Sequence, residues 1–194
     1  MRFSVRITGF GGQGVVTAGR ILALAAIQKN PQLHVIYTPS YGFATRGGNA
    51  MSDVILDDKP INYPKVIKLD LLVALSKAAY TTSIGIVDDK GMVLVDSSLV
   101  TNLQEPTASI KTVSMELAKT AEGLGSSMYT STVVLGALSR LLAEYLDPLA
   151  LEETVLNYFP KRYSEQNKKA LELGGSMIAA PPRDGSKVML VRRV

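Results

Sequence analysis

The amino-acid sequence predicts an α/β fold: a three-layer α/β/α Rossmann-like domain with a mostly parallel sheet and C-terminal helices. Residues 2–28 read as a strand, a glycine-rich turn and a helix in direct succession. Farther along, short apolar segments typical of buried central strands alternate with turns and helical patterns. These observations indicate a doubly wound arrangement, and 194 residues suit a single domain over 1–194.

The opening strand and helix differ in their hydrophobic period. Apolar Phe3, Val5 and Ile7 alternate with polar residues, which predicts a strand with one buried face. After the glycines, apolar residues recur at the spacing of a helix, at Val15, Ala18, Ile21, Leu22 and Ala25. Asn30-Pro31 then ends the predicted helix.

The next strands are expected in chain order at residues 33–38, 51–56, 70–74, 92–95 and 110–113. The glycine-rich stretch 38–50 reads as a long loop, and the strands on its two sides could pair as a hairpin. Ser76 and Ser114 are expected to cap helices. Asp96-Ser97-Ser98 follows a buried strand, at the sheet end where α/β domains place ligands.

The C-terminal part, residues 126–175, is expected to be helical. A helix over 130–146 is apolar around most of its circumference, which predicts that it is central or covered by another subunit; on the second alternative, the isolated chain would form a homodimer. Gly136 within it suggests a close helix contact. Asp147 should cap a helix over 148–158, and Ser164 a helix that ends before Gly174-Gly175. The tail 183–194 reads as a strand or a disordered end.

The turn after the first strand carries a G-x-G-x-x-G pattern at Gly9, Gly11 and Gly14. Such a turn lets another group approach the backbone, and the free N–H groups of the helix start favour an anion. However, no acidic residue follows the second strand to hold a ribose, and Arg20-Ile21 replaces the Lys-Ser/Thr of a P-loop. The alternative is that these glycines only allow a tight turn and close strand–helix packing.

Composition excludes several classes of function. An apolar fraction of 46% supports a full core, while a net charge of +4 without long basic runs argues against nucleic acid. The absence of cysteine excludes disulfides and iron–sulfur clusters ligated by this chain alone, and suits a cytoplasmic protein. The single His34 makes a zinc site improbable, and no apolar run is long enough to cross a membrane.

Several catalytic signatures are absent from the sequence, including H-E-x-x-H, G-x-S-x-G, C-x-x-C and the G-D-G of enzymes that bind thiamine diphosphate. The chain therefore offers one backbone cradle and one unusual loop, in which Arg46 is the only charge. This profile is typical of a subunit that completes a site on another chain. Arg46 would contact a ligand or partner, or alternatively pin the loop to its own domain through carbonyls or an acid such as Asp96.

These motifs resemble the gamma subunit of 2-oxoacid:ferredoxin (acceptor) oxidoreductases. The resemblance rests on GFGGQGVVTAGRILALAA, SYG…RGGNAMSDVIL, KPINYP, LDLLVAL, VVLGAL and an N-x-x-A-x-x-x-G pattern, and it covers roughly residues 2–175. One departure is that Phe43-Ala44-Thr45 replaces the family's Pro-Glu-Met before Arg46. Any contact made by the missing acid in relatives cannot be assumed here.

The resemblance implies a non-catalytic subunit of a thiamine diphosphate-dependent complex that converts a 2-oxoacid, with 2-oxoglutarate preferred, and CoA to acyl-CoA, CO2 and reduced acceptor. Alpha, beta and in some complexes delta subunits would carry thiamine diphosphate, Mg2+ and iron–sulfur clusters, and ferredoxin or another acceptor would receive the electrons. This chain would bind no cofactor firmly. The residues expected at a cofactor or partner contact are Gly11, Gly12, Gln13, Gly14, Tyr41, Gly42, Arg46, Gly47 and Gly48.

Two rival interpretations remain open at this point. The chain could be a self-contained nucleotide-binding oxidoreductase, although the missing acid after the second strand counts against it. It could also be a ligand-free structural subunit, in which the glycines only shape turns. The nature of the 2-oxoacid and the oligomeric state of the isolated chain are not determined by these residues.

Overall fold

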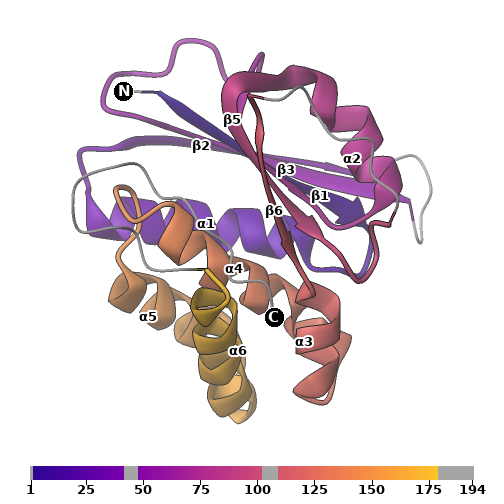
Figure 1. Ribbon diagram of the computed structural model, residues 1–194. Coiled ribbons are helices and arrows are strands. Elements are labelled where there is room, and N and C mark those ends of the chain that lie inside the picture. Colours follow the sequence, from indigo (N-terminus) through magenta and orange to yellow (C-terminus); the bar gives the residue numbers. More distant parts are fainter. Residues whose placement is uncertain (1, 42–47, 102–108, 179–194) are drawn as a thin grey trace.

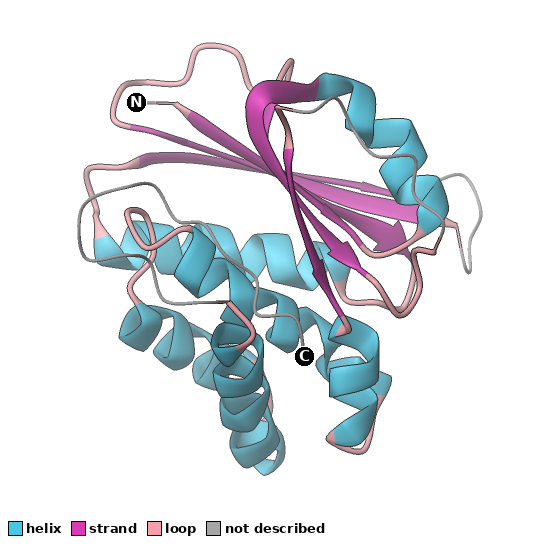
Figure 2. Ribbon diagram, in the orientation of Figure 1, coloured by secondary structure: helices cyan, strands magenta, loops and turns pink. Residues whose placement is uncertain are grey.

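The computed structural model describes residues 2–41, 48–101 and 109–178. Its centre is a six-stranded sheet with the order β2-β3-β1-β4-β5-β6 (Figures 1 and 2). The strands are β1 (Phe3–Phe10), β2 (His34–Tyr41), β3 (Asn49–Asp57), β4 (Leu69–Ala74), β5 (Val87–Asp96) and β6 (Lys111–Met115). The helices are α1 (Val15–Lys29), α2 (Lys77–Ser83), α3 (Leu117–Gly123), α4 (Thr130–Leu141), α5 (Pro148–Tyr158) and α6 (Ser164–Ser176), with short 3-10 turns η1 (Ile84–Ile86), η2 (Ser127–Tyr129) and η3 (Lys161–Tyr163).

The sheet is mostly parallel, as predicted, with one antiparallel strand. β1, β4, β5 and β6 pair in parallel, whereas β3 is antiparallel to both β1 and β2. The expected hairpin pairing of β2 and β3 is therefore confirmed, and β3 inserts between β2 and β1. β2 lies at an edge, where Pro39 is tolerated because an edge strand can lack one backbone donor.

The stretch 38–50 contains less loop than the sequence predicted. β2 continues to Tyr41 and β3 begins at Asn49, so that Tyr41 pairs with Ala50. The ladder to the neighbouring strand supplies backbone hydrogen bonds in spite of the glycine and proline content, and this overrides the local preference for a loop. The rest of the expected loop falls on residues 42–48, of which 42–47 lie outside the described residues.

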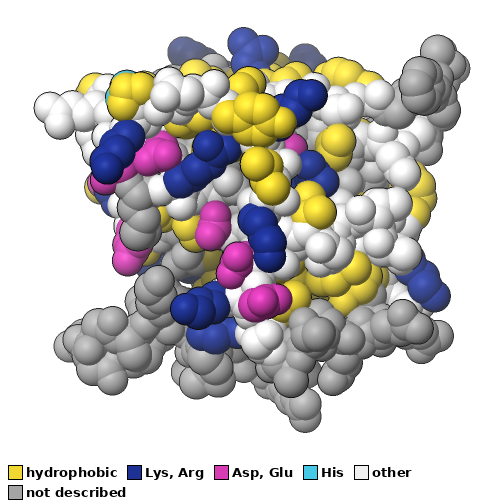
Figure 3. Space-filling view, turned by 90° about the horizontal axis from the view of Figure 1, so that it is seen from above, with side chains coloured by type: hydrophobic (Ala, Val, Ile, Leu, Met, Phe, Trp, Pro, Cys, Tyr) yellow, Lys and Arg dark blue, Asp and Glu magenta, His cyan; other side chains and the backbone are white. Residues whose placement is uncertain are grey.

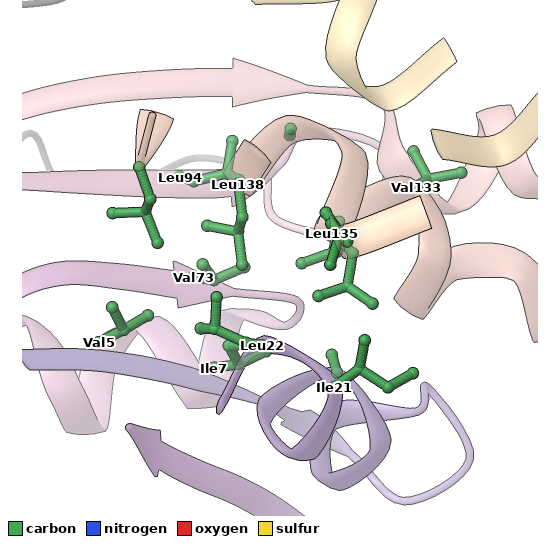
Figure 4. Close-up of a cluster of buried hydrophobic side chains, with 14 of the residues drawn as sticks. Val5, Ile7, Ile21, Leu22, Val73, Leu94, Val133, Leu135 and Leu138 are labelled. Carbon is green, nitrogen blue, oxygen red and sulfur yellow. The ribbon is translucent and has the colours of Figure 1, made fainter. Parts of the chain in front are cut away.

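The helices cover the two faces of the sheet unequally. α1 and α3 to α6 lie on one side, and α2 lies on the other (Figure 1). The larger core fills the first side and includes fully buried Ile7, Leu22, Leu94 and Leu135 (Figure 4). A smaller cluster around Tyr80 packs under α2. Seen from above, the surface carries hydrophobic, basic and acidic side chains close together (Figure 3).

β1 is more deeply buried than an alternating strand requires. Ser4 and Thr8, expected on an exposed face, are buried. Arg6 forms a two-pronged ion pair with Asp53 of β3, at 2.7 and 2.8 Å between nitrogen and oxygen atoms. The hydroxyl of Thr8 donates to the Ala50 carbonyl at 3.2 Å. A central position in the sheet buries both faces, and its polar groups are consequently paired.

Two of the four predicted helix caps are confirmed. The hydroxyl of Ser76 accepts from the N–H of Ala79 at 3.2 Å, and the carboxylate of Asp147 accepts from the N–H of Leu149 at 2.8 Å. The other two predictions are wrong. Ser114 lies inside β6, and Ser164 is the first residue of α6 and makes no side-chain capping bond.

α4 is central to the helical layer and shorter than predicted. It ends at Leu141, and residues 142–145 form turns that keep Leu142 and Leu146 buried. Of Val134, Leu138 and Leu141, which would form an apolar surface for another copy, the first two have 0% exposure within the chain's own fold and Leu141 is half-buried. The burial of Val134 and Leu138 favours the alternative of a central helix.

α4 and α6 approach so closely that their backbones touch. A Cβ atom on Gly136 would collide with the carbonyl oxygen of Leu171, and one on Gly174 with that of Val133. The predicted close helix contact at Gly136 is thus confirmed. The prediction that Gly174 and the next glycine end α6 is wrong, because the helix continues to Ser176 and uses these glycines for packing.

We predict that Gly136→Ala and Gly174→Ala each lower the free energy of unfolding by about 1–3 kcal/mol, because the added methyl group meets rigid backbone. Gly123→Ala, at the end of α3, is the matched control, since its new Cβ would find nothing within 4 Å. Urea unfolding of the three variants measures the effect. Equal stability of all three would contradict the close contact.

Candidate functional site

The glycine turn lies where the sequence placed it, at the carboxyl end of β1. β1 ends at Phe10 and α1 begins at Val15, with residues 11–14 between them. Gly12 and Gly14 have φ angles of 99° and 70°, in the left-handed region that favours glycine. The predicted order of strand, glycine turn and helix is confirmed.

The N-terminus of α1 is left without a side-chain cap. Gly14 occupies the N-cap position and offers no side-chain acceptor, and the first turn contains no acidic residue. The first N–H groups of a helix have no partners within the helix, and the helix dipole favours negative charge there. The N-terminus of α1 therefore favours the binding of an anion or of a hydrogen-bond acceptor.

Gln13 joins the turn to the two neighbouring strands. Its Oε1 accepts from the N–H of Phe10 at 2.7 Å, and its Nε2 donates to the carbonyl of Leu75 at 3.0 Å. Leu75 directly follows β4, and its own N–H donates to the carbonyl of Thr8 at 2.8 Å. The side chain expected to serve a ligand site thus also holds the carboxyl ends of β1 and β4 together.

The second predicted segment meets the turn directly. The N–H of Gly11 donates to the carbonyl of Gly48 at 2.9 Å, next to the paired residues Phe10 and Asn49. Tyr41 lies at the same end of the sheet, and 71% of it is exposed. The structure thus brings Gly11, Gly12, Gln13 and Gly14 together with Gly48, and places Tyr41 two strands away from β1. The predicted site residues Gly42, Arg46 and Gly47, and the departure Phe43-Ala44-Thr45, lie outside the described residues.

The beginning of α4 completes the surroundings of the turn, which sequence reasoning missed. A Cβ atom on Gly14 would lie 2.6 Å from the Cβ of Ser131. The sequence signal for this contact is the hydroxyl-rich stretch 126–132, S-S-M-Y-T-S-T, whose pattern by itself predicts only the start of the helical part. Gly14 is therefore required both for its backbone conformation and for the approach of α4.

The first turn of α1 is also hydrogen-bonded to strands β2 and β3 of the sheet. The hydroxyl of Ser52 donates to the carbonyl of Val15 at 3.0 Å, and the hydroxyl of Tyr37 donates to the carbonyl of Val16 at 2.9 Å. Burial raises the pKa of the Tyr37 phenol above its ordinary value. These bonds hold the helix start in one position relative to β2 and β3.

Asp96, at the carboxyl end of β5, serves the fold. It has no exposed surface, and its carboxylate accepts from the N–H of Ala118 at 2.9 Å and from the N–H of Ser98 at 3.0 Å. Asp96 in β5 therefore caps α3, although it lies 22 residues before Ala118 in the chain. This explains why Ser114 is not needed as a cap. Both carboxylate oxygens are occupied, so Asp96 is a poor internal partner for Arg46.

The part of the chain that the structure describes contains no cluster of three or more side chains suited to hold a metal ion. His34, the single histidine, is exposed at the start of the edge strand β2. Within the same described ranges, no helix is both long and apolar enough to cross a membrane. Near the glycine turn, the described residues offer backbone groups, the Gln13 amide and the hydroxyl group of Ser131, with Tyr41 at the same end of the sheet.

This fold and site define a class: a Rossmann-like α/β domain whose glycine turn contacts a second loop. The chain belongs to the pyruvate ferredoxin/flavodoxin oxidoreductase family, whose model matches residues 4–177. The resemblance seen in the sequence motifs is therefore confirmed.

Individual relatives agree with this assignment. The chain is 37% identical, over 90% of its length and 92% of the relative's, to the 2-oxoglutarate synthase subunit KorC of Methanocaldococcus jannaschii. It is 30% identical, over 87% and 92% of the two lengths, to the pyruvate/ketoisovalerate oxidoreductases common subunit gamma of Thermococcus kodakarensis. The crystal structure of a keto/oxoacid ferredoxin oxidoreductase gamma subunit from Geobacter sulfurreducens matches with a TM-score of 0.77 and 30% identity, covering 91% of this chain and 95% of that one.

We predict that Gly14→Ala destabilises the chain more than Gly12→Ala. Both substitutions force a non-glycine residue to positive φ, at about 1–2 kcal/mol each. Only Gly14→Ala also meets a neighbour, Ser131, whereas a Cβ on Gly12 would find nothing within 4 Å. Urea unfolding measures the difference. The double variant Gly14→Ala/Ser131→Gly should recover part of the loss, and purely additive effects would rule out the contact.

Proposed function

We propose that this chain is the non-catalytic gamma subunit of a multisubunit thiamine diphosphate-dependent 2-oxoacid:ferredoxin (acceptor) oxidoreductase. The complex would convert a 2-oxoacid and CoA to acyl-CoA, CO2 and reduced acceptor. Family membership supports the oxidoreductase complex, and the 37% identity to a 2-oxoglutarate synthase subunit supports 2-oxoglutarate as the substrate. Residues 1–194 would act as one gamma-type domain in the cytoplasm, with a helical part over 126–175.

The observation that carries this proposal is the Gly11–Gly48 hydrogen bond. It joins the two segments that the sequence singled out, and it places them at the uncapped start of α1. The contact surface would consist of the turn, Tyr41 and Gly48 together with Gly42, Arg46 and Gly47 of the connecting segment. An anionic group of CoA or an acidic group of a partner subunit suits this set, because backbone N–H groups and an arginine bind anions.

In this arrangement the chemistry belongs to other chains. Alpha and beta subunits, with a delta subunit in some complexes, would hold thiamine diphosphate, Mg2+ and iron–sulfur clusters, and would pass electrons to ferredoxin or another acceptor. Thiamine diphosphate supplies carbanion stabilisation and the clusters supply electron storage. Among the described residues of this chain there is no group of three or more His, Cys, Asp or Glu side chains that could hold a metal ion. Its contribution would be to bind and orient.

A ligand-free structural subunit is the second candidate, and one observation favours it. A side chain on Gly9, Gly14 or Gly19 would collide with a neighbouring side chain of the same domain, so these three glycines can be explained without a ligand. Gly12 distinguishes the two candidates, because a Cβ there would face open space. A self-contained nucleotide-binding oxidoreductase has less support, since no acid follows the second strand.

We predict that the purified chain turns over no 2-oxoacid when it is supplied with thiamine diphosphate, CoA and an electron acceptor. Affinity purification from the native host should recover an iron–sulfur protein and a thiamine diphosphate-binding subunit, identified by mass spectrometry. The assembled complex should oxidise 2-oxoglutarate. Turnover by the rigorously pure chain, or recovery without any such partner, would refute the proposal.

We predict that Arg46→Ala weakens binding of the assembled complex to CoA, or of this chain to its partner subunits, by several-fold. Loss of a charge-assisted hydrogen bond corresponds to about 1.5–3 kcal/mol. The melting temperature of the free chain should change little. A large fall in melting temperature with unchanged complex kinetics would instead assign Arg46 to the fold.

Gly12→Val tests the turn in the same assay. The branched side chain would project into open space, so the far-UV circular dichroism spectrum should stay near that of the wild type with modest destabilisation from the positive φ. Activity of the assembled complex should fall, because the backbone could no longer be approached. Full activity of the variant complex would favour the ligand-free structural subunit.

A further inference from the structure

The two edge strands of the sheet, β2 and β6, differ in their protection against pairing with another chain (Figure 1). β6 has five residues and carries the exposed Lys111. β2 has eight residues, none of which is Asp, Glu, Lys or Arg. Short length and charged side chains are common devices that keep an edge strand from pairing. β2 lacks both of them.

The register of the sheet shows which backbone groups of β2 face outward. The N–H of Gly11 in the turn donates to the carbonyl of Gly48, so alternation directs the even-numbered residues of β3 toward β1 and the odd-numbered ones toward β2. The even-numbered residues of β2 lie opposite odd-numbered residues of β3, and their backbone groups therefore pair inside the sheet. The residues of β2 whose backbone groups face outward are Val35, Tyr37, Pro39 and Tyr41.

Pro39 agrees with this assignment. Proline has no N–H group, and in edge strands it occurs where the missing donor would face solvent. Pro39 lies at such an outward position and removes one donor from the edge. The outward N–H and carbonyl groups of Val35 and Tyr37 remain, and no strand among the described residues pairs with them. β2 therefore offers a free edge to a short extended segment.

The face of α1 beside this edge is partly apolar and exposed. The Tyr37 hydroxyl donates to the carbonyl of Val16, which places the tyrosine ring against the first turns of the helix. Arg20, Leu24 and Ile27 follow Val16 at helical spacing. Leu24 is 45% exposed and Ile27 is 42% exposed. A segment paired with β2 would cover part of this face.

Tyrosine and arginine side chains gather at the same place. Burial raises the pKa of the Tyr37 phenol, Tyr41 and Tyr158 raise it further, and Arg20 lowers it, so these three side chains act on Tyr37 from nearby. The Arg20 guanidinium lies over the Tyr158 ring, 5.8 Å from its centroid. Tyrosine and arginine are enriched where proteins bind one another. The outer edge of β2 thus has the composition of a protein interface.

Arg20 indicates the charge of the group that binds there. It is exposed, and it makes no ion pair or hydrogen bond with another residue that the structure describes. A carboxylate matches a guanidinium through two parallel hydrogen bonds. β2 contains no acid, so a second copy of β2 on the same edge would supply no carboxylate. The edge therefore fits a chain of different sequence that carries Asp or Glu.

We infer that an extended segment of a partner subunit pairs with the outer edge of β2 as an additional strand and presents a carboxylate to Arg20. Main-chain hydrogen bonds to Val35 and Tyr37 attach the segment, and the exposed apolar side chains of α1 accommodate its own. The edge is continuous with the proposed contact surface, because Tyr41 belongs to both. The existence of the partner subunit rests on the proposed function.

Hydrogen exchange on the complex recovered from the native host tests the strand pairing. The intact complex is exchanged and quenched, and this chain is analysed at single-residue resolution by mass spectrometry with electron-transfer fragmentation. The amides of Val35 and Tyr37 should exchange at least tenfold more slowly in the complex than in the free chain. Those of Ile36 and Thr38 should be slow in both states, because they pair with β3. Unchanged exchange at Val35 and Tyr37 would overturn the inference.

Arg20→Glu tests the predicted carboxylate. Unlabelled variant displaces labelled wild-type chain from the complex, and Arg20→Glu should require at least a tenfold higher concentration than the wild type. Arg162→Glu is the matched control, since Arg162 also lies over a tyrosine ring, 4.8 Å from the centroid of Tyr163. It should compete as well as the wild type, and both free variants should melt as the wild type does. Equal competition by the two variants would overturn the inference.

These outcomes are distinguishable from a failure of the proposed function. A complex that contains this chain but leaves Val35 and Tyr37 unprotected refutes the docking site alone. Recovery of the chain without any partner refutes the proposed function, and the docking site with it. Sedimentation of the free chain tests a second copy as the occupant. A dimer whose formation slows exchange at Val35 and Tyr37 would assign the edge to that copy and overturn the inference.

Discussion

The hydrogen bonds at the carboxyl end of β1 hold the candidate site together. Beyond Phe10 the ladder stops, and each backbone group there would lose a partner. The Gln13 side chain, the Gly48 carbonyl and the backbone of Leu75 satisfy these groups from three different segments. These bonds join the turn, the β2–β3 hairpin and the residue after β4 at one end of the sheet.

Four glycines of the opening segment are each required for a different physical reason. Gly9 makes room for a side chain of the same turn, and Gly12 provides a positive φ facing open space. Gly14 provides a positive φ and also admits Ser131 of α4, while Gly19 lets α1 approach β3. Packing within the domain thus accounts for Gly9, Gly14 and Gly19, whereas a Cβ atom on Gly12 would face open space.

Close approach of backbones at glycines also determines the packing of the helical layer. α4 is buried on every side over Thr130–Ser139, because α6 packs on it through Gly136 and Gly174 and the sheet covers its opposite face. The hydroxyl of Thr132 donates to Oδ1 of Asn167 at 2.8 Å and fixes the register of the two helices. The family-like N-x-x-A-x-x-x-G pattern thus describes a helix contact. This layer positions Ser131 against the glycine turn.

Hydrophobic period and glycine placement determined by themselves the α/β class, the strand–turn–helix opening and most strand positions, since these depend on local sequence. The caps at Ser76 and Asp147 were equally local. Only the tertiary structure decided that β3 inserts antiparallel beside β1, that Asp96 caps α3 from a distant strand, and that Gln13 and Ser131 surround the turn. Those features join residues far apart in the chain, and a local pattern carries no information about which distant group will satisfy a backbone donor.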